Sequence, residues 1–279
     1  MPLESLTPVH TAPLFAPLSA ELVGVLRGLG AGDWAKPTVA GAWRVKDVAG
    51  HLLDGNLRRL AFGRDAHSGR GPASPAYGDV VAFIDELNAS GVAYAARLSP
   101  RLLTDLLEVT GEWVARHFAS LPPDAEARFA VDWAGEARST NWMDVGREYT
   151  EHWHHQAQIR DAVEAPGLLQ PRWLGPLLEL SVRSFPRAYR AVEAPIGTAV
   201  VFEVEAETAY AWSLTRAEAG WVVMRGRADR AAASVRTDAD TAWRLLYNAL
   251  APEDAKTRIA IAGEPALASP LLAARSVMV

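Results

Sequence analysis

The sequence predicts a mainly helical bundle over its first two thirds, followed by a small α+β domain. Up to about residue 192, apolar residues recur every three or four positions, in segments separated by Pro, Gly and Ser. After Pro195, short stretches rich in β-branched and aromatic residues take their place. With 279 residues, of which 49% are hydrophobic, the chain can bury enough apolar surface to fold. We therefore expect two domains, at 1–194 and 195–279.

The first domain is expected to consist of helices of about 20 residues, the length typical of helical bundles. They are expected at about 18–29, 44–63, 79–98, 101–121, 141–163 and 171–192. The Gly/Pro/Ser-rich loop at 65–78 is long for a compact domain, which favours either a binding loop or a mobile one. Residues 128–139 lack clear helical spacing and are expected to form an irregular or extended connection.

The second domain alternates short strands with helices, which defines its α+β class. Strands are expected at about 198–206, 210–215, 220–224, 234–237 and 258–262. A helix is expected at about 240–250, and a terminal helix after the last strand.

Composition excludes several classes of function. The chain contains no cysteine, which excludes disulfides, iron–sulfur clusters, zinc fingers and a protein thiol nucleophile, so a metal ion would need His, Asp or Glu ligands. A net charge of −5 gives no attraction for nucleic acid. No apolar run approaches the length of a membrane span, and the N-terminus lacks the pattern of a signal peptide. We expect a cytoplasmic protein without membrane or nucleic-acid partners.

One helix concentrates residues suited to metal binding. Glu151 and His155 are four positions apart in the helix expected at 141–163, so their side chains can reach the same point. A polar stripe beside the apolar face of this helix is formed by Asp144, Glu148, Glu151, His155 and Gln158. Gln156 interrupts the apolar face itself. Such a stripe is typical of a metal or substrate site inside a bundle, although Glu–His pairs are also common on surface helices.

His51, in the helix expected at 44–63, is the candidate third ligand. Gly50 beside it would let another helix approach closely. A lone histidine at such a position is often a core residue, but with Glu151 and His155 it completes a set of two imidazoles and one carboxylate. His152 and His154 point away from Glu151 by helical rotation, so we expect them around the site or on the surface. The remaining histidines, at positions 10, 67 and 117, have no expected partners.

Two sequence runs resemble a known family. The run at 43–52, WRVKDVAGHL, with NLRR at 56–59 and the Glu151–His155–Gln156 pattern, resembles the DinB-like metal-binding superfamily. Within it, the similarity is to the mycothiol-dependent maleylpyruvate isomerase family. The resemblance implies a four-helix bundle with His51, Glu151 and His155 as metal ligands. The run at 261–268, IAGEPALA, is similar to the sterol-carrier-like C-terminal domain of that family.

The sequence departs from this family at one point. The isomerases rely on an arginine of the C-terminal domain, in a Gly-Arg step after its helix. This chain has LYNA at 246–249 in that region, without such a step. Arg225, Arg227 or Arg244 are the candidates to take that place.

The resemblance implies a divalent-metal-dependent enzyme that uses a low-molecular-weight thiol, mycothiol or a similar one, as cosubstrate. The reaction would be a thiol S-transfer or a cis–trans isomerisation of a small molecule, and an oligomer is compatible with it. Zinc is the expected ion, with nickel or another divalent metal as alternatives. Two other functions fit the same residues: a hydrolase acting through metal-bound water, and a non-enzymatic stress-related or ligand-binding module. The sequence assigns no catalytic or thiol-binding residue.

Overall fold

The computed structural model describes residues 3–67, 69–74 and 76–277. Contacts divide the chain into two compact units. The helical unit contains His10–Arg128 and Thr140–Gly167. The sheet unit contains Phe129–Ser139 together with the described parts of Met1–Val9 and Leu168–Met278. This division falls earlier in the chain than the boundary expected at 194/195, which stays a prediction.

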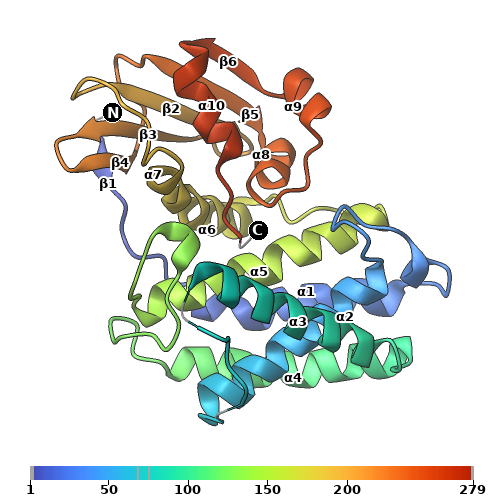
Figure 1. Ribbon diagram of the computed structural model, residues 1–279. Coiled ribbons are helices and arrows are strands. Elements are labelled where there is room, and N and C mark those ends of the chain that lie inside the picture. The colour runs from blue at the N-terminus through green and yellow to red at the C-terminus, as the bar shows by residue number, and fades with distance from the viewer. Residues whose placement is uncertain (1–2, 68, 75, 278–279) are drawn as a thin grey trace. The chain divides into compact units, whose positions relative to one another are not determined.

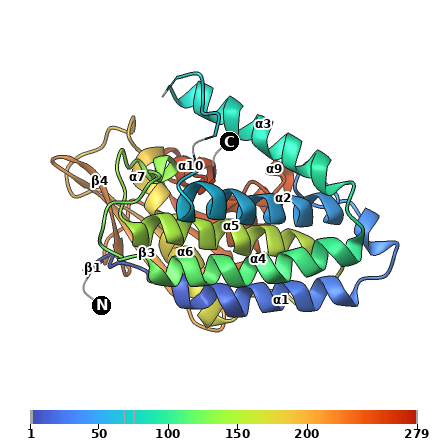
Figure 2. The same cartoon turned by 90° about the horizontal axis from the view of Figure 1, so that it is seen from below.

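The helical unit confirms the first five expected helices to within a few residues. They are α1 (Phe15–Gly28), α2 (Val45–Arg58), α3 (Tyr77–Ala95), α4 (Pro100–Ser120) and α5 (Asn141–Ala162). Figure 2 shows α1, α2, α4 and α5 running alongside one another, with α3 along the outer side of α2. A π-helical segment, Arg59–Arg64, continues α2. The loop before α3 is irregular in its described part, and its residues Ser68 and Pro75 lie outside the described residues.

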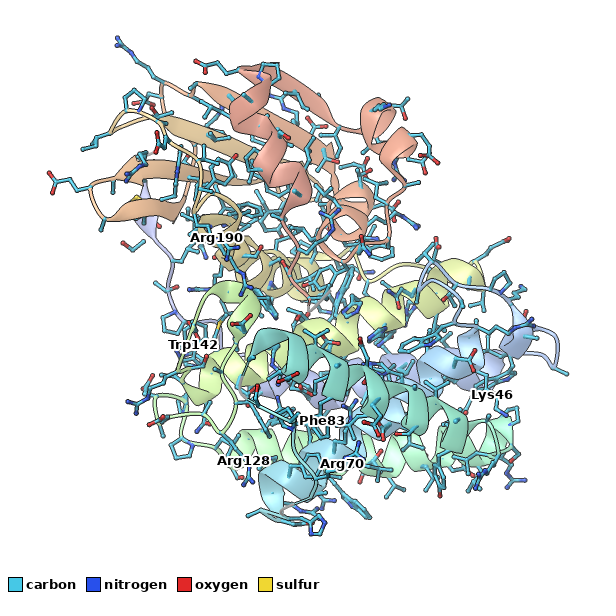
Figure 3. The ribbon with its side chains drawn as sticks, viewed as in Figure 1. Lys46, Arg70, Phe83, Arg128, Trp142 and Arg190 are labelled. Carbon is cyan, nitrogen blue, oxygen red and sulfur yellow. The ribbon has the colours of Figure 1, made fainter. Side chains whose placement is uncertain are left out.

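Local chemistry sets where these helices begin. At the start of α2, the backbone N–H of Arg44 donates to Oδ2 of Asp47 at 2.9 Å, half of a capping box. At the start of α4, Ser99 accepts a hydrogen bond from the N–H of Leu102, and Pro100 occupies the first position, where a missing N–H costs nothing. Nζ of Lys46, labelled in Figure 3, donates to the carbonyl of Ala96 and ties the start of α2 to the end of α3.

Apolar residues from four helices form the core of the helical unit. Buried members include Leu22 and Leu26 of α1, Val48 and Leu52 of α2, Leu103 and Leu107 of α4, and Ile159 of α5. Helix α3 lies so close to α2 at Gly50 that an added Cβ there would be only 2.6 Å from the Cβ of Ala95. Gln156 is buried among these helices, where its amide donates to the carbonyl of Leu18 and accepts from Arg160, so the polar residue is hydrogen-bonded.

The sheet unit confirms the expected α+β class. Its six strands lie in the order β1-β4-β3-β2-β5-β6 (Figure 1). The strands are β1 (Glu4–Ser5), β2 (Ala199–Glu205), β3 (Tyr210–Ala217), β4 (Gly220–Arg225), β5 (Ala233–Asp238) and β6 (Ala260–Gly263). Strands β2 and β5 are parallel, and every other neighbouring pair is antiparallel. The helices of this unit are α6 (Pro171–Ser181), α7 (Phe185–Ala188), α8 (Ala239–Leu246), α9 (Pro252–Arg258) and α10 (Pro265–Ala273).

Three features of this unit differ from the sequence prediction. The helix expected at 171–192 is interrupted by a 3-10 turn at Val182–Ser184 and ends at Ala188. Pro186 accounts for the break, because it has no N–H to donate to the preceding turn. Helix α9 was not expected, and neither was β1, which pairs Glu4 and Ser5 with β4. Residues 128–139 are irregular as expected, with one 3-10 turn at Asp132–Ala134.

Across the part of the chain that the structure describes, no helix is both long enough and apolar enough to cross a membrane.

Candidate metal centre

Helices α2 and α5 hold the candidate site between them. Close pairs of side chains, His51 with His155 and Arg59 with Asp144, show that the two helices run antiparallel. The buried face of α2 includes Val48, His51 and Leu52, so the imidazole of His51 is directed at a neighbouring helix. The polar stripe of α5 faces the same region.

The structure brings the three sequence-predicted ligands together. One ligand atom from each of His51, Glu151 and His155 lies within 4.8 Å of the other two. Nε2 of His155 is 3.5 Å from Oε2 of Glu151, and the rings of His51 and His155 are 4.6 Å apart between centroids. Both histidines are nearly enclosed, at 9% and 8% exposure. We call these three residues the metal triad; their role as ligands stays a prediction.

Two observations show that the metal triad fits a divalent ion. Nδ1 of His155 lies 2.8 Å from Oε1 of Gln158, an acceptor that fixes the ring proton on Nδ1 and leaves Nε2 free to bind a metal. Nδ1 of His51 is buried and has no hydrogen-bond partner among the described residues. An enclosed imidazole nitrogen without a partner is the kind of atom that a metal ion satisfies. Two imidazoles and one carboxylate are ligands that zinc and related ions accept.

The charges of the metal triad also favour a cation. Burial lowers the pKa of His51 well below its ordinary value, and the neighbouring His155 lowers it further. Burial acts to raise the pKa of Glu151, but its contact with His155 and the other nearby histidines outweigh burial and lower this pKa to about 2. At neutral pH the site therefore offers an ionised carboxylate and a neutral His51 imidazole, so few protons must leave when a metal binds.

Aromatic rings surround the metal triad. The indole of Trp43, just before α2, lies 4.9 Å from the ring of His51 and 6.2 Å from that of His155. The ring of His154 lies against that of His155, with 3.9 Å between centroids and a tilt of 38°, and its Nδ1 is 2.8 Å from the carbonyl of Thr150. His152 points elsewhere, with its ring edge-on to Phe15. That these two histidines are not ligands stays a prediction; His154 is buried.

Two carboxylates of the polar stripe, Asp144 and Glu148, pair with Arg59, a contact that the sequence did not predict. Arg59 donates to both oxygens of Asp144, at 3.0 and 2.7 Å, and to Glu148 at 2.8 Å. All three side chains are buried. The sequence does contain a sign of this cluster: Arg59 continues the buried positions Leu52 and Asn56 of α2 at helical spacing, where a charge needs a partner.

The three arginines considered as replacements for the missing Gly-Arg step form ion pairs within the sheet unit. Arg225 pairs with Glu179 at 3.0 Å, and Arg227 with Glu203 at 3.2 Å. Arg244 pairs with Asp240 at 2.8 Å. None of these contacts assigns a catalytic role.

The fold and the site define a class of protein, the helical bundles that gather histidine and carboxylate side chains between their helices. Comparison with protein families makes this specific. Residues 15–160 match the family described as the mycothiol maleylpyruvate isomerase N-terminal domain. Because the match covers more than half of the chain, the protein belongs to this family.

Solved structures show a similar fold at low sequence identity. The mycothiol-dependent maleylpyruvate isomerase matches with a TM-score of 0.52 and 13% identity, over 92% of this chain and 95% of that chain. A mutant of that enzyme, with one histidine replaced by alanine, matches with a TM-score of 0.50 and 12% identity over the same shares of both chains. Identity this low establishes a shared fold and no more.

A sterol carrier protein 2-like protein from Aedes aegypti matches 34% of this chain and 97% of its own, at 15% identity and a TM-score of 0.26. A score this low supports no argument, so the sterol-carrier-like character of the sheet unit rests on its sequence resemblance. No curated protein sequence matches this chain.

Proposed function

We propose that the protein is a divalent-metal-dependent enzyme that uses a low-molecular-weight thiol as cosubstrate, in a thiol S-transfer or cis–trans isomerisation of a small electrophilic molecule. The observation behind the proposal is the convergence of His51, Glu151 and His155 to within 4.8 Å. The family match and the fold of a mycothiol-dependent isomerase support the choice of a thiol.

The residues of the site have separate roles in this proposal. His51, Glu151 and His155 would hold the ion, and three protein ligands leave positions for an exogenous group. Bound there, a divalent cation lowers the pKa of a coordinated thiol, so that the nucleophilic thiolate exists at neutral pH. Gln158 keeps Nε2 of His155 available as a ligand, and the indole of Trp43 supplies an apolar wall beside two of the ligands. Because the chain has no cysteine, the reacting sulfur comes from the cosubstrate.

Metal content is the first test. We expect elemental analysis to find one divalent ion per chain in the native protein, with zinc as the expected ion and nickel as the alternative. Glu151→Ala and His51→Ala should each lose most of it. His10→Ala is the matched control, because His10 is exposed and outside the metal triad. Equal metal content in all four proteins would contradict the proposed site.

Thiol consumption is the second test. With metal-loaded protein, we expect mycothiol or a simpler thiol to be consumed with chlorodinitrobenzene, or to accelerate isomerisation of maleylpyruvate, and His51→Ala to abolish the effect. Indifference to this substitution would refute the proposal. Turnover of an ester or amide without any thiol would instead identify a hydrolase that uses metal-bound water. A metal-loaded protein without turnover in any of these assays would favour a binding module.

A further inference from the structure

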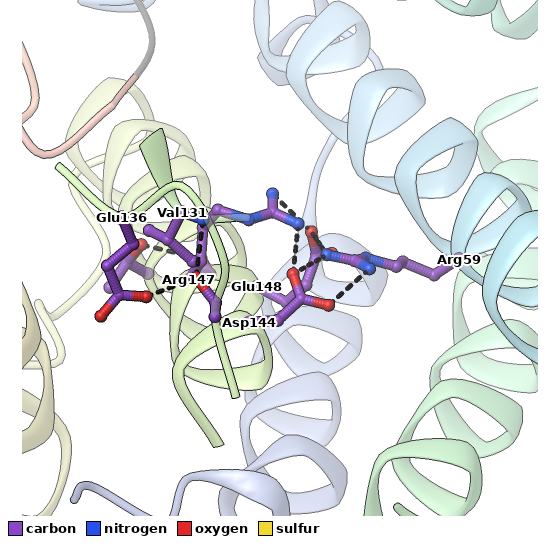
Figure 4. A network of polar contacts seen from close by, with 8 residues as sticks. Arg59, Val131, Glu136, Asp144, Arg147 and Glu148 are labelled. Atoms are coloured by element: carbon purple, nitrogen blue, oxygen red, sulfur yellow. Dashed lines mark hydrogen bonds and ion pairs between the residues drawn. The ribbon is translucent and has the colours of Figure 1, made fainter. Parts of the chain in front are cut away.

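A buried ion-pair cluster joins α2 to α5 next to the metal triad. The guanidinium of Arg59 contacts both carboxylates described above, Asp144 through two parallel hydrogen bonds and Glu148 through one. Arg147 adds a second positive charge, 2.8 Å from Asp144 and 2.9 Å from Glu148 (Figure 4). We call Arg59, Asp144 and Glu148 the Arg59 rung; their ion pairs connect the two helices.

The Arg59 rung and the metal triad are built on the same plan. Each consists of one residue, from α2 or from the π-helical segment that continues it, facing two residues of α5 that are four positions apart. The α5 pairs, 144/148 and 151/155, are offset by seven residues, which is about two helical turns or 10 Å. Along α2 and its π-helical continuation, His51 and Arg59 are eight residues apart, or about 12 Å. Two contacts at such a separation fix both the distance between two antiparallel helices and their register.

The chemistry of the Arg59 rung makes it the stiffer of the two contacts before any ion binds. Two parallel hydrogen bonds between a guanidinium and a carboxylate hold both groups in one plane. Arg59 is 7% exposed and Asp144 is 4% exposed, so water cannot replace either partner. Among the described residues, the side chains of the metal triad form no hydrogen bond or ion pair between α2 and α5, since the His155 Nε2–Glu151 Oε2 contact of 3.5 Å lies within α5.

The backbone shows a local adjustment at the same place. The π-helical segment Arg59–Arg64 begins at Arg59 itself, where α2 ends. A change from α to π geometry rotates the following side chains about the helix axis, and such changes are frequent at functional sites. Arg59 therefore lies where the α-helical geometry of α2 changes to π-helical geometry.

We propose that Arg59 is a positioning residue for the metal centre: by pairing with Asp144 and Glu148 it sets the spacing and register of α2 and α5, so that His51 meets Glu151 and His155 before the ion arrives. The proposal rests on the proposed function, because it assumes that the metal triad binds a divalent ion.

The test measures cobalt binding by the full-length, metal-stripped protein. Co²⁺ reports both affinity, by competition with a chelator, and ligand geometry, by its visible absorption spectrum. We expect Arg59→Met to weaken Co²⁺ binding at least about 10-fold, the scale seen when groups that orient metal ligands are removed, and to change the spectrum. Arg59→Lys, which keeps the charge without the planar fork, should lie between Arg59→Met and the native protein.

Arg58→Met is the matched control. Arg58 is the neighbouring residue, but its partners are Asp54 of α2 and Asn88 of α3, so its loss leaves the α2–α5 contact intact. The charge of Arg58 also acts on His51, and its removal can only ease the binding of a cation, so we expect no loss of Co²⁺ affinity and a native spectrum in this variant. If Arg59→Met does not fold, Asp144→Asn serves in its place. It removes the carboxylate that accepts two hydrogen bonds from Arg59 and keeps the shape of the side chain.

A merely structural role would give a different result. If Arg59→Met, or Asp144→Asn in its place, lowers the melting temperature but binds Co²⁺ with native affinity and spectrum, the inference is overturned. If the native protein itself binds no Co²⁺, the proposed metal site fails, and that outcome is distinct from the first.

Discussion

Replacing Gln158 by leucine is expected to weaken metal binding about 10- to 100-fold, the usual cost of removing the partner of a metal-bound histidine. The substitution removes the acceptor that lies 2.8 Å from Nδ1 of His155. Gln158 is only 4% exposed, so water cannot take its place. The ring proton can then move to Nε2, which faces Glu151 at 3.5 Å and finds an acceptor there. A metal ion would have to displace that proton.

The expected loss corresponds to about 1.4 to 2.7 kcal/mol of binding free energy, at about 1.36 kcal/mol for each factor of ten. It can be measured by competition of Zn²⁺ or Co²⁺ against a chromophoric chelator. The same loss should appear in the stabilisation that metal gives, seen as a smaller rise in melting temperature on adding metal than in the native protein.

Gln158→Glu is the matched control, because a carboxylate oxygen also accepts the Nδ1 proton. We expect its metal affinity to equal or exceed that of the native protein, since a carboxylate makes the imidazole a stronger ligand. Native affinity in Gln158→Leu, or an equal loss in both variants, would refute the reasoning that the hydrogen bond to His155 controls its availability.

Three further predictions concern packing, titration and spectroscopy. Gly50→Ala should destabilise the protein by about 1–3 kcal/mol in chemical denaturation, because the added Cβ would lie 2.6 Å from the Cβ of Ala95 in α3. A Cβ added at Gly55, on the same helix, has no atom of the described residues within 4 Å, so Gly55→Ala should stabilise the protein by about 0.5–1 kcal/mol. Burial raises the pKa of Asp144 to about 6, with the Glu148 carboxylate acting in the same direction and Arg59 opposing it. The folded state therefore binds the Asp144 proton more tightly than the unfolded state does. As the pH rises from about 4 to 6, the unfolding free energy of the native protein should fall relative to that of Asp144→Asn. A difference in unfolding free energy that stays constant over this pH range would contradict the raised pKa. Co²⁺ should quench part of the tryptophan fluorescence, and Trp43→Phe should remove that part without changing the metal content, because Trp43 contacts two of the ligands.

The helices of the bundle could be predicted because their determinants are local. Apolar spacing, the prolines at 100, 122 and 123, and the cap at Ser99 each act over only a few neighbouring residues. Glu151 and His155 could be paired for the same reason, since one helical turn brings them together. The expectation failed where the determinants are distant: β1 exists only because Glu4 and Ser5 pair with β4, more than 200 residues away.

The polar stripe of α5 shows the same division within the candidate site. Its spacing indicated that Asp144, Glu148, Glu151 and His155 share one side of the helix. Which of them face a histidine and which face an arginine depends on how α2 lies against α5. Arg59 stood in the sequence as part of a family-like run, and only its contacts show that two of the five stripe residues, Asp144 and Glu148, pair with an arginine instead of being available to a ligand.

The sequence by itself determined the helical class of the first part, the α+β class of the second, the need for His and carboxylate ligands, and the identity of the three candidates. These follow from composition, from periodicities that operate within one helix or strand and, for the ligand role of His51, from the family resemblance of the run at 43–52. Only the tertiary structure decided that His51 meets Glu151 and His155, that Gln158 fixes the proton of His155, and that Arg59 takes up Asp144 and Glu148. The physical reason is that the contacts between α2 and α5 depend on helix register and spacing, which the packing of the whole bundle sets.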